Sequence, residues 1–456
     1  MPDPPIQAWI DAHRPRLFAE LCDYLAIPSV SALGQGIEAA SDWVERRLTA
    51  LGAQVRRFEP PGGNPILYAE LGPAEADRAL LIYNHYDVQP VDPLALWTQP
   101  PFEPTQREGR LYARGTADNK ANFLSRVQAV EAWQALRGPL PLRIRWIVEG
   151  EEETGSRSLP GFCAAEGWRW ADSAGCLWEA GYKDEHERMT LYSGLKGLAA
   201  FELVARTAEV DKHSSMATLL PNAGWRLTWA LASLKDPDER ILIEGLMDHV
   251  RAPGPAELRA LAAIPFDDAA FRASHGQSTL LTGVRGAEAL KRHLYQPTCT
   301  ICGVTCGYQD PGMKTVLPHM ALAKLDFRLV PDLEPELVGR LLRAHLDARG
   351  FGDIELRPLA GEHPAPGHPE SAVVRAAVEA VAAVSGVEPV LWPHMGATGP
   401  MHPVTSAFGI PAVGFGTGYW DSRNHAPDEH IRLADYWEGI AVAAEFFARF
   451  AAAPLA

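Results

Sequence analysis

The chain is poor in cysteine, in positive charge and in long apolar runs. Six cysteines among 456 residues are too few for a disulfide framework. The net charge of −15 argues against nucleic acid as a partner. No apolar run reaches membrane-spanning length, and the first residues, M-P-D-P-P, lack the basic and apolar regions of a signal peptide. We therefore expect a soluble cytoplasmic protein with reduced thiols and with no nucleic-acid or membrane partner.

The first part of the chain has the pattern of an α/β domain. A chain of 456 residues, 47% of them hydrophobic, is long enough for two or three globular domains. Apolar strand-like runs alternate with helical periodicity here, which favours a sheet covered on both faces. The expected strands are 54–58, 66–71, 79–84 and 142–148, and the expected helices are 6–27 with an interruption at Pro15, 37–51 and 120–136.

After about residue 193 the pattern changes to that of a smaller α+β domain. Strands are expected at 197–206, 298–304, 320–330 and 354–358, helices at 223–234 and 334–349, and little regular pattern between them up to about 283. Helix–strand alternation returns beyond a segment rich in Pro, Gly and His at 363–368. We therefore predict a discontinuous α/β domain with a mainly parallel central sheet, 1–193 and 366–456, and an inserted domain, 194–365.

The acidic run E-G-E-E-E-T-G-S at 149–156 directly follows the apolar strand-like run 142–148. The carboxylates therefore arrive at the C-terminal end of a strand, where open α/β sheets place their ligands. Four carboxylates within five residues repel one another, so a folded protein must compensate them. The compensation is either solvent, as in an ordinary exposed loop, or a bound cation.

Four other stretches carry residues of the same chemical kind. His85 and Asp87 end the predicted strand 79–84 and share one of its faces, which suits a metal-bound imidazole held by a carboxylate. Asp118 precedes a helix and is either its N-cap or a carboxylate that bridges metals. Glu179 follows a short apolar run, and His425 stands in N-H-A-P-D-E at 424–429. Each alone has an ordinary structural explanation, as a strand-end histidine, a helix cap or a surface residue.

Together these stretches resemble the dinuclear-zinc metallopeptidase family of carnosinases, aminoacylases and glutamate carboxypeptidases, which includes acetylornithine and succinyl-diaminopimelate deacylases. H-x-D, the later Asp, E-G-x-E-E-x-G-S and the terminal H-A-P-x-E follow in the family's order over nearly the whole chain. The stretches K-T-V-L-P at 314–318 and R-L-V-P at 328–331 are most similar to the carnosinase and dipeptidase branch. The resemblance implies a catalytic metal-binding domain, 1–193 and 366–456, and a lid and dimerisation domain, 194–365.

The resemblance also implies a role for each residue of the motifs. His85 would bind one metal ion and His425 the other, with Asp118 bridging both. Glu153 would complete one site and Glu179 the other. The remaining roles are Glu152 as the general base and Asp87 as the group that orients His85, whereas Glu149 and Glu151 receive no direct role.

This ligand set predicts the cofactor and the reaction. Three carboxylates against two divalent ions leave a charge of +1, which keeps the centre Lewis acidic and lowers the pKa of its water toward ~7. Imidazole and carboxylate ligands without thiolate suit Zn²⁺, and also Mn²⁺ or Co²⁺. The expected reaction is amide hydrolysis by a water that bridges two metals, with Glu152 taking its proton and passing it to the leaving amine.

The lid domain carries the residues expected to contact the substrate. D-K-H-S at 211–214 resembles the family motif whose histidine, here His213, reaches the partner subunit's active site and stabilises the oxyanion. Arg328 would bind the substrate's terminal carboxylate as a bidentate fork, and Thr315 would contact the substrate. Without the resemblance, His213 reads as an exposed loop histidine and Arg328 as part of a structural salt bridge.

One loop departs from the carnosinase branch. Where that branch has Gly-Gly-Ser-Ile-Pro, this chain has G-A-T-G-P-M-H-P at 396–403, so we expect backbone donors, including Gly399, but no serine hydroxyl. The resemblance implies cleavage of dipeptides or short peptides by a homodimer joined through the lid domain. Because of the departure in this loop, it implies no preference for carnosine. The alternatives are an N-acyl-amino-acid deacylase or carbamoyl amidohydrolase and, from another class, a non-catalytic metal-binding or receptor protein.

The remaining cysteines and histidines do not form a convincing second metal site. Cys299, Cys302 and Cys306 lack a fourth ligand nearby, and a strand would turn Cys299 and Cys302 to opposite faces. Three further histidines receive no role and are expected to make local hydrogen bonds; they are His319, His394 and His402.

Overall fold

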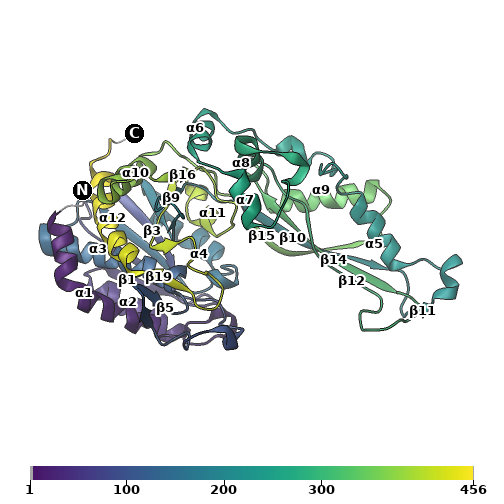
Figure 1. Ribbon diagram of the computed structural model, residues 1–456, viewed down its shortest axis with the longest axis horizontal. Coiled ribbons are helices and arrows are strands. Elements are labelled where there is room, and N and C mark those ends of the chain that lie inside the picture. Colours follow the sequence, from purple (N-terminus) through teal and green to yellow (C-terminus); the bar gives the residue numbers. More distant parts are fainter. Residues whose placement is uncertain (1–3, 455–456) are drawn as a thin grey trace. The chain divides into compact units, whose positions relative to one another are not determined.

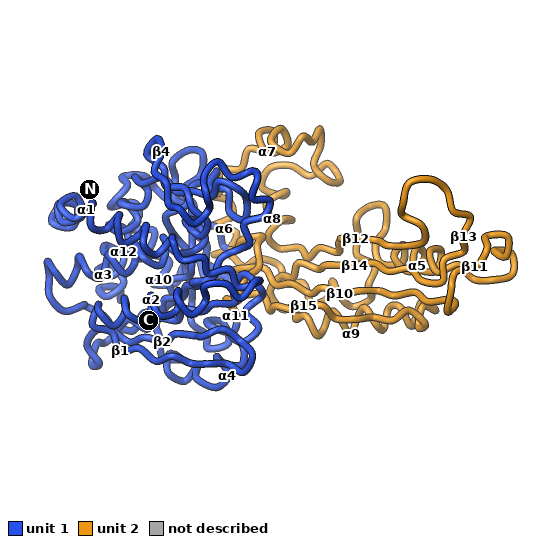
Figure 2. The backbone as a smooth tube through the Cα atoms, turned by 90° about the horizontal axis from the view of Figure 1, so that it is seen from below, with its two compact units in different colours: residues 1–194, 367–393, 403–456 blue, residues 195–366, 394–402 orange. Residues whose placement is uncertain are grey.

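The computed structural model describes residues 4–454 and divides the chain into two compact units. Unit 1 comprises residues 1–194, 367–393 and 403–456, and unit 2 comprises 195–366 and 394–402 (Figure 2, blue and orange). The short stretch 394–402 lies in unit 2, although the sequence pattern places it in the larger domain. Each unit has its own hydrophobic core.

Unit 1 is built on a ten-stranded sheet of mainly parallel character. Its centre consists of β6 (Arg143–Glu149), β3 (Ala79–His85), β7 (Gly175–Trp178) and β17 (Ala412–Gly414), and each neighbouring pair among these four is parallel. The strands β3 and β7 are buried along their whole length, which requires cover on both faces of the sheet. The antiparallel strands β1 (Gln54–Phe58) and β2 (Ile66–Leu71) extend the sheet beyond β6.

Four helices of unit 1 pack side by side over the sheet (Figure 1). They are α1 (Pro4–Leu25), α3 (Ala121–Arg137), α12 (Leu433–Ala452) and α10 (Ala372–Ser385). The prediction of an interruption at Pro15 is wrong, because α1 runs through this residue. Burial of Leu17 and Leu21 beyond the proline offsets the loss of one helical hydrogen bond. The helix α2 (Ile37–Ala50) contacts β1 and β2.

Unit 2 is a four-stranded antiparallel sheet with two helices packed on it. The strand order is β12 (Thr300–Cys306), β14 (Met320–Leu329), β10 (Gly197–Arg206) and β15 (Glu355–Glu362). Burial alternates along β14 and most of β10, so one face of the sheet forms the core with α5 (Ala223–Ala232) and α9 (Pro335–Ala348). A short pair, β11 (Lys212–His213) with β13 (Val316–Leu317), lies outside this sheet.

Three helices of unit 2 lie where the sequence pattern is weak or absent. They are α6 (Pro255–Ala263), α7 (Asp268–Ser274) and α8 (Gly286–Tyr295). The helices α6 and α7 have few buried residues, so their apolar periodicity is faint. Among the described residues, no helix is long and apolar enough to cross a membrane.

Candidate metal centre

The ends of three neighbouring parallel strands bring the centre together in unit 1. His85 is the last residue of β3 and pairs in register with Glu149, the last residue of β6. Glu179 directly follows β7. Because the carboxyl ends of parallel strands meet at one edge, the imidazole and the carboxylates of three distant stretches become neighbours.

His85 is fixed at one ring nitrogen and presents the other. Its Nδ1 lies 3.1 Å from the carbonyl oxygen of Asp87 and 3.3 Å from Asp87 Oδ1, and both side chains are fully buried. The second carboxylate oxygen of Asp87 accepts a hydrogen bond from the backbone N–H of Glu153 at 3.1 Å. With Nδ1 held in this way, Nε2 of His85 is directed at Asp118, which suits a ligand nitrogen.

Asp118 lies between two histidines. Its Oδ1 is 3.1 Å from His85 Nε2, and its Oδ2 is 3.0 Å from His425 Nε2. The helix-cap interpretation of Asp118 is wrong, because α3 begins at Ala121 and its cap position, Lys120, has no side-chain cap. One carboxylate that offers an oxygen to each of two imidazoles has the geometry of a bridging ligand.

His425 also approaches the acidic run. Its Nε2 lies 3.3 Å from Glu153 Oε2, and the Glu153 side chain is only 3% exposed. The same Glu153 oxygen accepts a hydrogen bond of 2.8 Å from Gln89 Nε2. Ligand atoms of His85, Asp118 and Glu153 all fall within 4.8 Å of one another.

The acidic run is not an exposed loop, and its carboxyl groups differ in the hydrogen bonds that they accept. Glu149 is buried and accepts hydrogen bonds from Tyr83 at 2.5 Å and Ser156 at 2.8 Å. Glu151 accepts hydrogen bonds from the backbone N–H groups of Asn64 and Ser158, which hold the turn after β6. Among the described residues, no hydrogen-bond donor to the Glu152 carboxyl is found.

The backbone of Glu179 is held by two buried asparagines. Asn119 Nδ2 donates to the Glu179 carbonyl at 2.9 Å, and Asn84 Nδ2 donates to the same oxygen at 3.3 Å. Asn84 Oδ1 in turn accepts from Arg126 of α3. By contrast, the side-chain oxygen Oε2 of Glu179 is buried without a hydrogen-bond partner in residues 4–454. The side chain is therefore free to act as a ligand while its backbone is fixed.

The electrostatics of the centre call for a cation. Burial, together with repulsion from Asp118, raises the pKa of Glu153 to about 8. Burial also raises the pKa of Glu179 to about 7, and burial and repulsion from Glu179 raise that of Glu152 well above its usual value. Burial opposes ionisation of Asp118 too, but hydrogen bonds from His425 and His85 lower its pKa. Carboxyl groups that resist ionisation together are stabilised as anions by bound divalent ions.

The residues present therefore fit a divalent metal centre. The atoms directed inward are imidazole nitrogens and carboxylate oxygens, with no thiolate among them, a set that suits Zn²⁺, Mn²⁺ or Co²⁺. The unpartnered oxygen of Glu179 and the clustered ligand atoms of His85, Asp118 and Glu153 are the observations behind this fit.

The substrate-side residues predicted from the sequence all belong to unit 2. His213 is exposed, and its Nδ1 accepts a hydrogen bond from the backbone N–H of Ser215 at 3.2 Å, so a neutral ring carries its proton on Nε2. Thr315 is the residue whose carbonyl accepts from the backbone N–H of Ser214, next to His213. Arg328, on β14, donates to Thr398 Oγ1 at 2.7 Å.

The loop 396–403 has no serine, as its sequence shows, so a hydroxyl must come from another residue. Thr398, next to Gly399, supplies one and directs it at Arg328. The salt-bridge interpretation of Arg328 finds no support, because no ion pair of this guanidinium is found among the described residues. The residue type at position 398 could have revealed the hydroxyl from the sequence, because threonine carries the same donor and acceptor as serine.

The cysteines and remaining histidines behave largely as ordinary side chains. All six cysteines are unpaired, and Cys299 packs against the core of unit 2 whereas Cys302 is exposed. His319 pairs with Asp211 at 2.6 Å, as expected of a local hydrogen-bonding group. His402 stacks on His363, and His394 lies edge-on to Tyr295.

Sequence reasoning missed the supporting residues of the centre. Gln89 contacts Glu153, Asn84 and Asn119 hold Glu179, and Glu429 contacts the turn that carries Asp118. Each of these residues lies tens to hundreds of positions away in the chain from the residue that it contacts, so no local sequence spacing predicts the contact. Only the terminal H-A-P-x-E motif, which contains Glu429, gave a signal.

Comparison with known proteins is consistent with this geometry. Residues 81–449 match the sequence profile of peptidase family M20/M25/M40. The chain is 28% identical to the Beta-Ala-His dipeptidase of Mus musculus, over 96% of this chain and 94% of that protein. It is 28% identical to the Cys-Gly metallodipeptidase dug1 of Schizosaccharomyces pombe, over 74% of each. An M20 family metallo-carboxypeptidase from Sulfolobus solfataricus has a similar structure, with a TM-score of 0.88, 34% identity and coverage of 96% of this chain and 99% of that one.

Proposed function

The chain belongs to peptidase family M20/M25/M40 and is an enzyme that hydrolyses peptides, and on this premise we propose that it is a two-metal dipeptidase. Its substrates would be dipeptides or short peptides with a free C-terminal carboxylate. The observation that carries the proposal is the Asp118 carboxylate held between His85 and His425, with Glu153 and Glu179 beside it. The dipeptidase activities of the mouse and yeast relatives support the substrate class.

The proposed ligand roles combine the family resemblance with the observed contacts. Asp118, Glu153 and His425 would hold one ion, since their side chains converge within 3.3 Å contacts. His85, Asp118 and Glu179 would hold the other, with Asp87 fixing the orientation of His85. We propose Zn²⁺ as the ion, with Mn²⁺ or Co²⁺ as chemically suitable substitutes. Bound ions would supply the Lewis acidity that polarises the scissile carbonyl and acidifies the attacking water.

Glu152 is the residue we assign to proton transfer. It accepts the proton of the attacking water and delivers it to the departing amine, which leaves poorly unless it is protonated. Two features support this assignment. Hydrogen bonds occupy the carboxyls of Glu149 and Glu151, whereas no described residue donates one to Glu152. Burial also raises the pKa of Glu152, which favours a group that must receive and release a proton near neutral pH.

Unit 2 would supply the substrate contacts. Arg328 would bind the C-terminal carboxylate, with Thr398 orienting its guanidinium and with Thr315 and Gly399 as further contacts. His213 would donate from Nε2 to the oxyanion, a role supported by the acceptor position of its Nδ1. In the family arrangement that the motif resembles, this histidine serves the partner subunit's active site.

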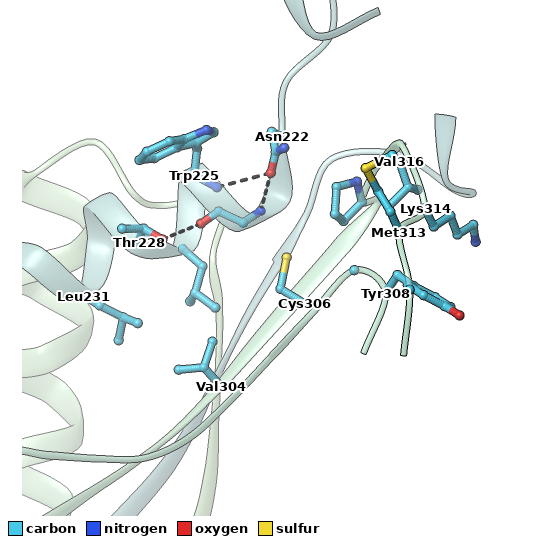
Figure 3. A pocket seen from close by; sticks show the side chains of 15 residues that line it. Asn222, Trp225, Thr228, Leu231, Val304, Cys306, Tyr308, Met313, Lys314 and Val316 are labelled. Carbon is cyan, nitrogen blue, oxygen red and sulfur yellow. Dashed lines mark hydrogen bonds between the residues drawn. The ribbon is translucent and has the colours of Figure 1, made fainter. Parts of the chain in front are cut away.

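A homodimer through unit 2 is part of the proposal. The edge strand β12 is exposed along most of its length, and Trp225 and Trp229 of α5 are 59% and 56% exposed. An open cavity of about 540 Å³ lies between α5 and the segment around Val304 and Cys306 (Figure 3). Unpaired edges and exposed tryptophans are liabilities in a monomer, and a second copy of the chain would cover them.

The deciding experiment is release of free amino acid from a mixed panel of dipeptides and N-acyl or N-carbamoyl amino acids. Metal-stripped protein is assayed with Zn²⁺, Mn²⁺ or Co²⁺ restored, and C-terminally amidated dipeptides serve as controls for carboxylate recognition. Preferential cleavage of dipeptides, lost on amidation, supports the proposal. Preferential cleavage of the acyl or carbamoyl compounds would assign the chain to deacylation, and inertness toward the whole panel with metals loaded would refute both.

A further inference from the structure

Glu429 is a buried carboxylate to which the proposed chemistry gives no role. Its side chain is 1% exposed, and each of its oxygens accepts two hydrogen bonds. Oε2 accepts from Arg114 Nη1 at 2.8 Å and from the Gly115 N–H at 2.9 Å. Oε1 accepts from the Ala117 N–H at 2.8 Å and from the Asp118 N–H at 3.1 Å. The turn 114–118 is therefore wrapped around a single carboxylate.

This carboxylate joins the two segments that carry Asp118 and His425. The strand β19 (His430–Arg432) pairs with β5 (Arg110–Tyr112), and the Ala113 N–H continues this ladder to the Glu429 carbonyl at 3.1 Å. Glu429 thus holds the turn of Asp118 through its side chain, and it follows His425 by four residues. One residue connects segments that are more than 300 positions apart in sequence.

The segment of His425 needs such an anchor. Arg423, His425 and Asp428 have φ values of 58°, 60° and 59°, in the left-handed region that costs a non-glycine residue on the order of 1 kcal/mol or more. Such backbone persists only when surrounding contacts hold it. Asp428 is held by the N–H and hydroxyl of Thr98 at 2.8 and 2.6 Å, and Glu429 supplies the adjoining contacts.

We propose that Glu429 is a positioning residue that sets the separation between Asp118 and His425, and so controls the affinity of the ion held on the His425 side. The inference rests on the two-metal centre of the proposed function. Loss of the carboxylate removes the hydrogen bonds that hold the turn of Asp118 to the segment of His425, and leaves the backbone ladder of β5 and β19 to join them. Binding of an ion by Asp118, Glu153 and His425 must then order these segments, and this loss of conformational entropy weakens the binding.

The ion on the His85 side depends on other contacts. His85 ends a buried strand and is held by Asp87, and Glu179 is held through its backbone by Asn84 and Asn119. Of its three ligands, only Asp118 contacts Glu429. The two ions are therefore expected to respond unequally to a change at position 429.

The test measures metal binding by the full chain rather than activity. Metal-stripped wild type, Glu429→Gln and Glu429→Asp are titrated with Zn²⁺ by calorimetry and with Co²⁺ by absorption, and thermal unfolding is recorded for each. Glutamine places an amide N–H against N–H donors, whereas aspartate keeps the charge and loses the reach. Asp421→Asn is the matched control, since Asp421 pairs with Arg110 at 3.0 Å and is not bonded to the turn 114–118.

The expected result is a split between the two ions. Wild type binds two per chain, Glu429→Gln keeps the tighter one and binds the other about 10–100-fold more weakly, and Glu429→Asp lies between them. Asp421→Asn binds both as wild type does. Unchanged binding of both ions, or equal weakening of both, in Glu429→Gln overturns the inference. If that variant does not fold, the same criteria apply to Glu429→Asp.

The experiment separates this inference from the proposed function. A wild type that binds fewer than two ions refutes the two-metal centre, and the role of Glu429 fails with it. A wild type that binds two ions and shows the split, but leaves dipeptides intact, refutes the substrate assignment alone.

Discussion

At the scale of single residues, neighbouring carboxyl groups of similar sequence context have different roles. Glu149 and Glu151 are occupied by hydrogen bonds within the protein, and Glu153 lies against His425. Glu152, between them, has no such donor among the described residues. Position in the turn after β6 thus decides which carboxyl builds the turn, which lies against the candidate metal centre and which is left for the proposed proton transfer.

Replacement of Glu152 by glutamine tests the last of these roles. Glu152→Gln keeps the size of the side chain and removes its ability to take a proton, so kcat should fall about 10²–10⁴-fold. Metal content should stay at the wild-type value, because Glu152 is not a proposed ligand. Turnover within a few-fold of wild type, with both ions present, would show that another group is the base.

Single residues also mark where sequence reasoning stops. The resemblance of the motifs to the metallopeptidase family implies that His85, Asp118 and His425 are neighbours, and their side chains do lie together. Thr398 and Glu429 were missed because their partners, Arg328 and the turn 114–118, are distant in sequence. Contacts of this kind follow from the packing of whole elements and leave no local pattern.

At the scale of elements, the parallel strands β3, β7 and β17 are held together by one buried arginine. Arg126 of α3 donates to the carbonyls of Tyr83, Trp178 and Phe415 and to Asn84 Oδ1. Tyr83, Trp178 and Phe415 lie at or near the ends of β3, β7 and β17. The guanidinium therefore fixes the strand ends from which the metal-facing side chains project.

Arg126→Met tests this role in the fold. The change leaves buried carbonyls without a donor, so the free energy of unfolding should fall by on the order of 3 kcal/mol. Arg46→Ala, at an exposed position of α2, is the control and should change it by less than about 0.5 kcal/mol. Denaturant unfolding of the metal-stripped proteins measures both, and equal effects would contradict the assigned role.

Element prediction worked where the sequence pattern of a strand is clear. The strands 54–58, 66–71 and 197–206 were predicted at their observed bounds, because apolar runs or alternation mark strands well. The helices α6, α7 and α8 were not predicted, and the prediction that Pro15 interrupts α1 was wrong. At Pro15 tertiary packing outweighed local propensity, whereas α6 and α7 bury too few residues to show a clear apolar pattern.

At the scale of the whole molecule, the clustered carboxyls link stability to pH. The raised pKa values of Glu153, about 8, and Glu179, about 7, mean that the folded metal-free chain holds protons that the unfolded chain has lost. Between pH of about 5 and 7, the free energy of unfolding should therefore fall as pH rises, by ~1.4 kcal/mol per pH unit for each extra proton. The raised pKa values of His85 and His425 act in the same direction.

Other groups limit this window. The lowered pKa of Asp118 affects stability only at more acidic pH, and Lys120, whose pKa burial lowers to about 7, opposes the trend above that value. With Zn²⁺ bound, the carboxylates need no protons, so the slope between pH of about 5 and 7 should flatten or reverse. Denaturant unfolding with and without Zn²⁺ measures both slopes, and identical slopes would contradict the prediction.

The proposed homodimer gives a second prediction at this scale. Trp229→Glu places a charge on the exposed face of α5, so the mass in solution should drop from two chains to one. Activity should fall with it, because His213 would no longer reach a partner. Trp168→Glu, an equally exposed tryptophan of unit 1, should keep both mass and activity. A fully active wild-type monomer would exclude a role for His213 across the interface.

The discontinuity of unit 1 has a consequence for how the enzyme is made. Four of the proposed ligands precede unit 2 in the chain, whereas His425 and Glu429 follow it. A ribosome therefore synthesises all of unit 2 before it reaches the last ligand, and unit 2 can fold while unit 1 is still incomplete. On the proposed ligand set, the metal centre cannot close before the segment of His425 has been synthesised, so a shorter nascent chain that already contains all of unit 2 still lacks a complete centre.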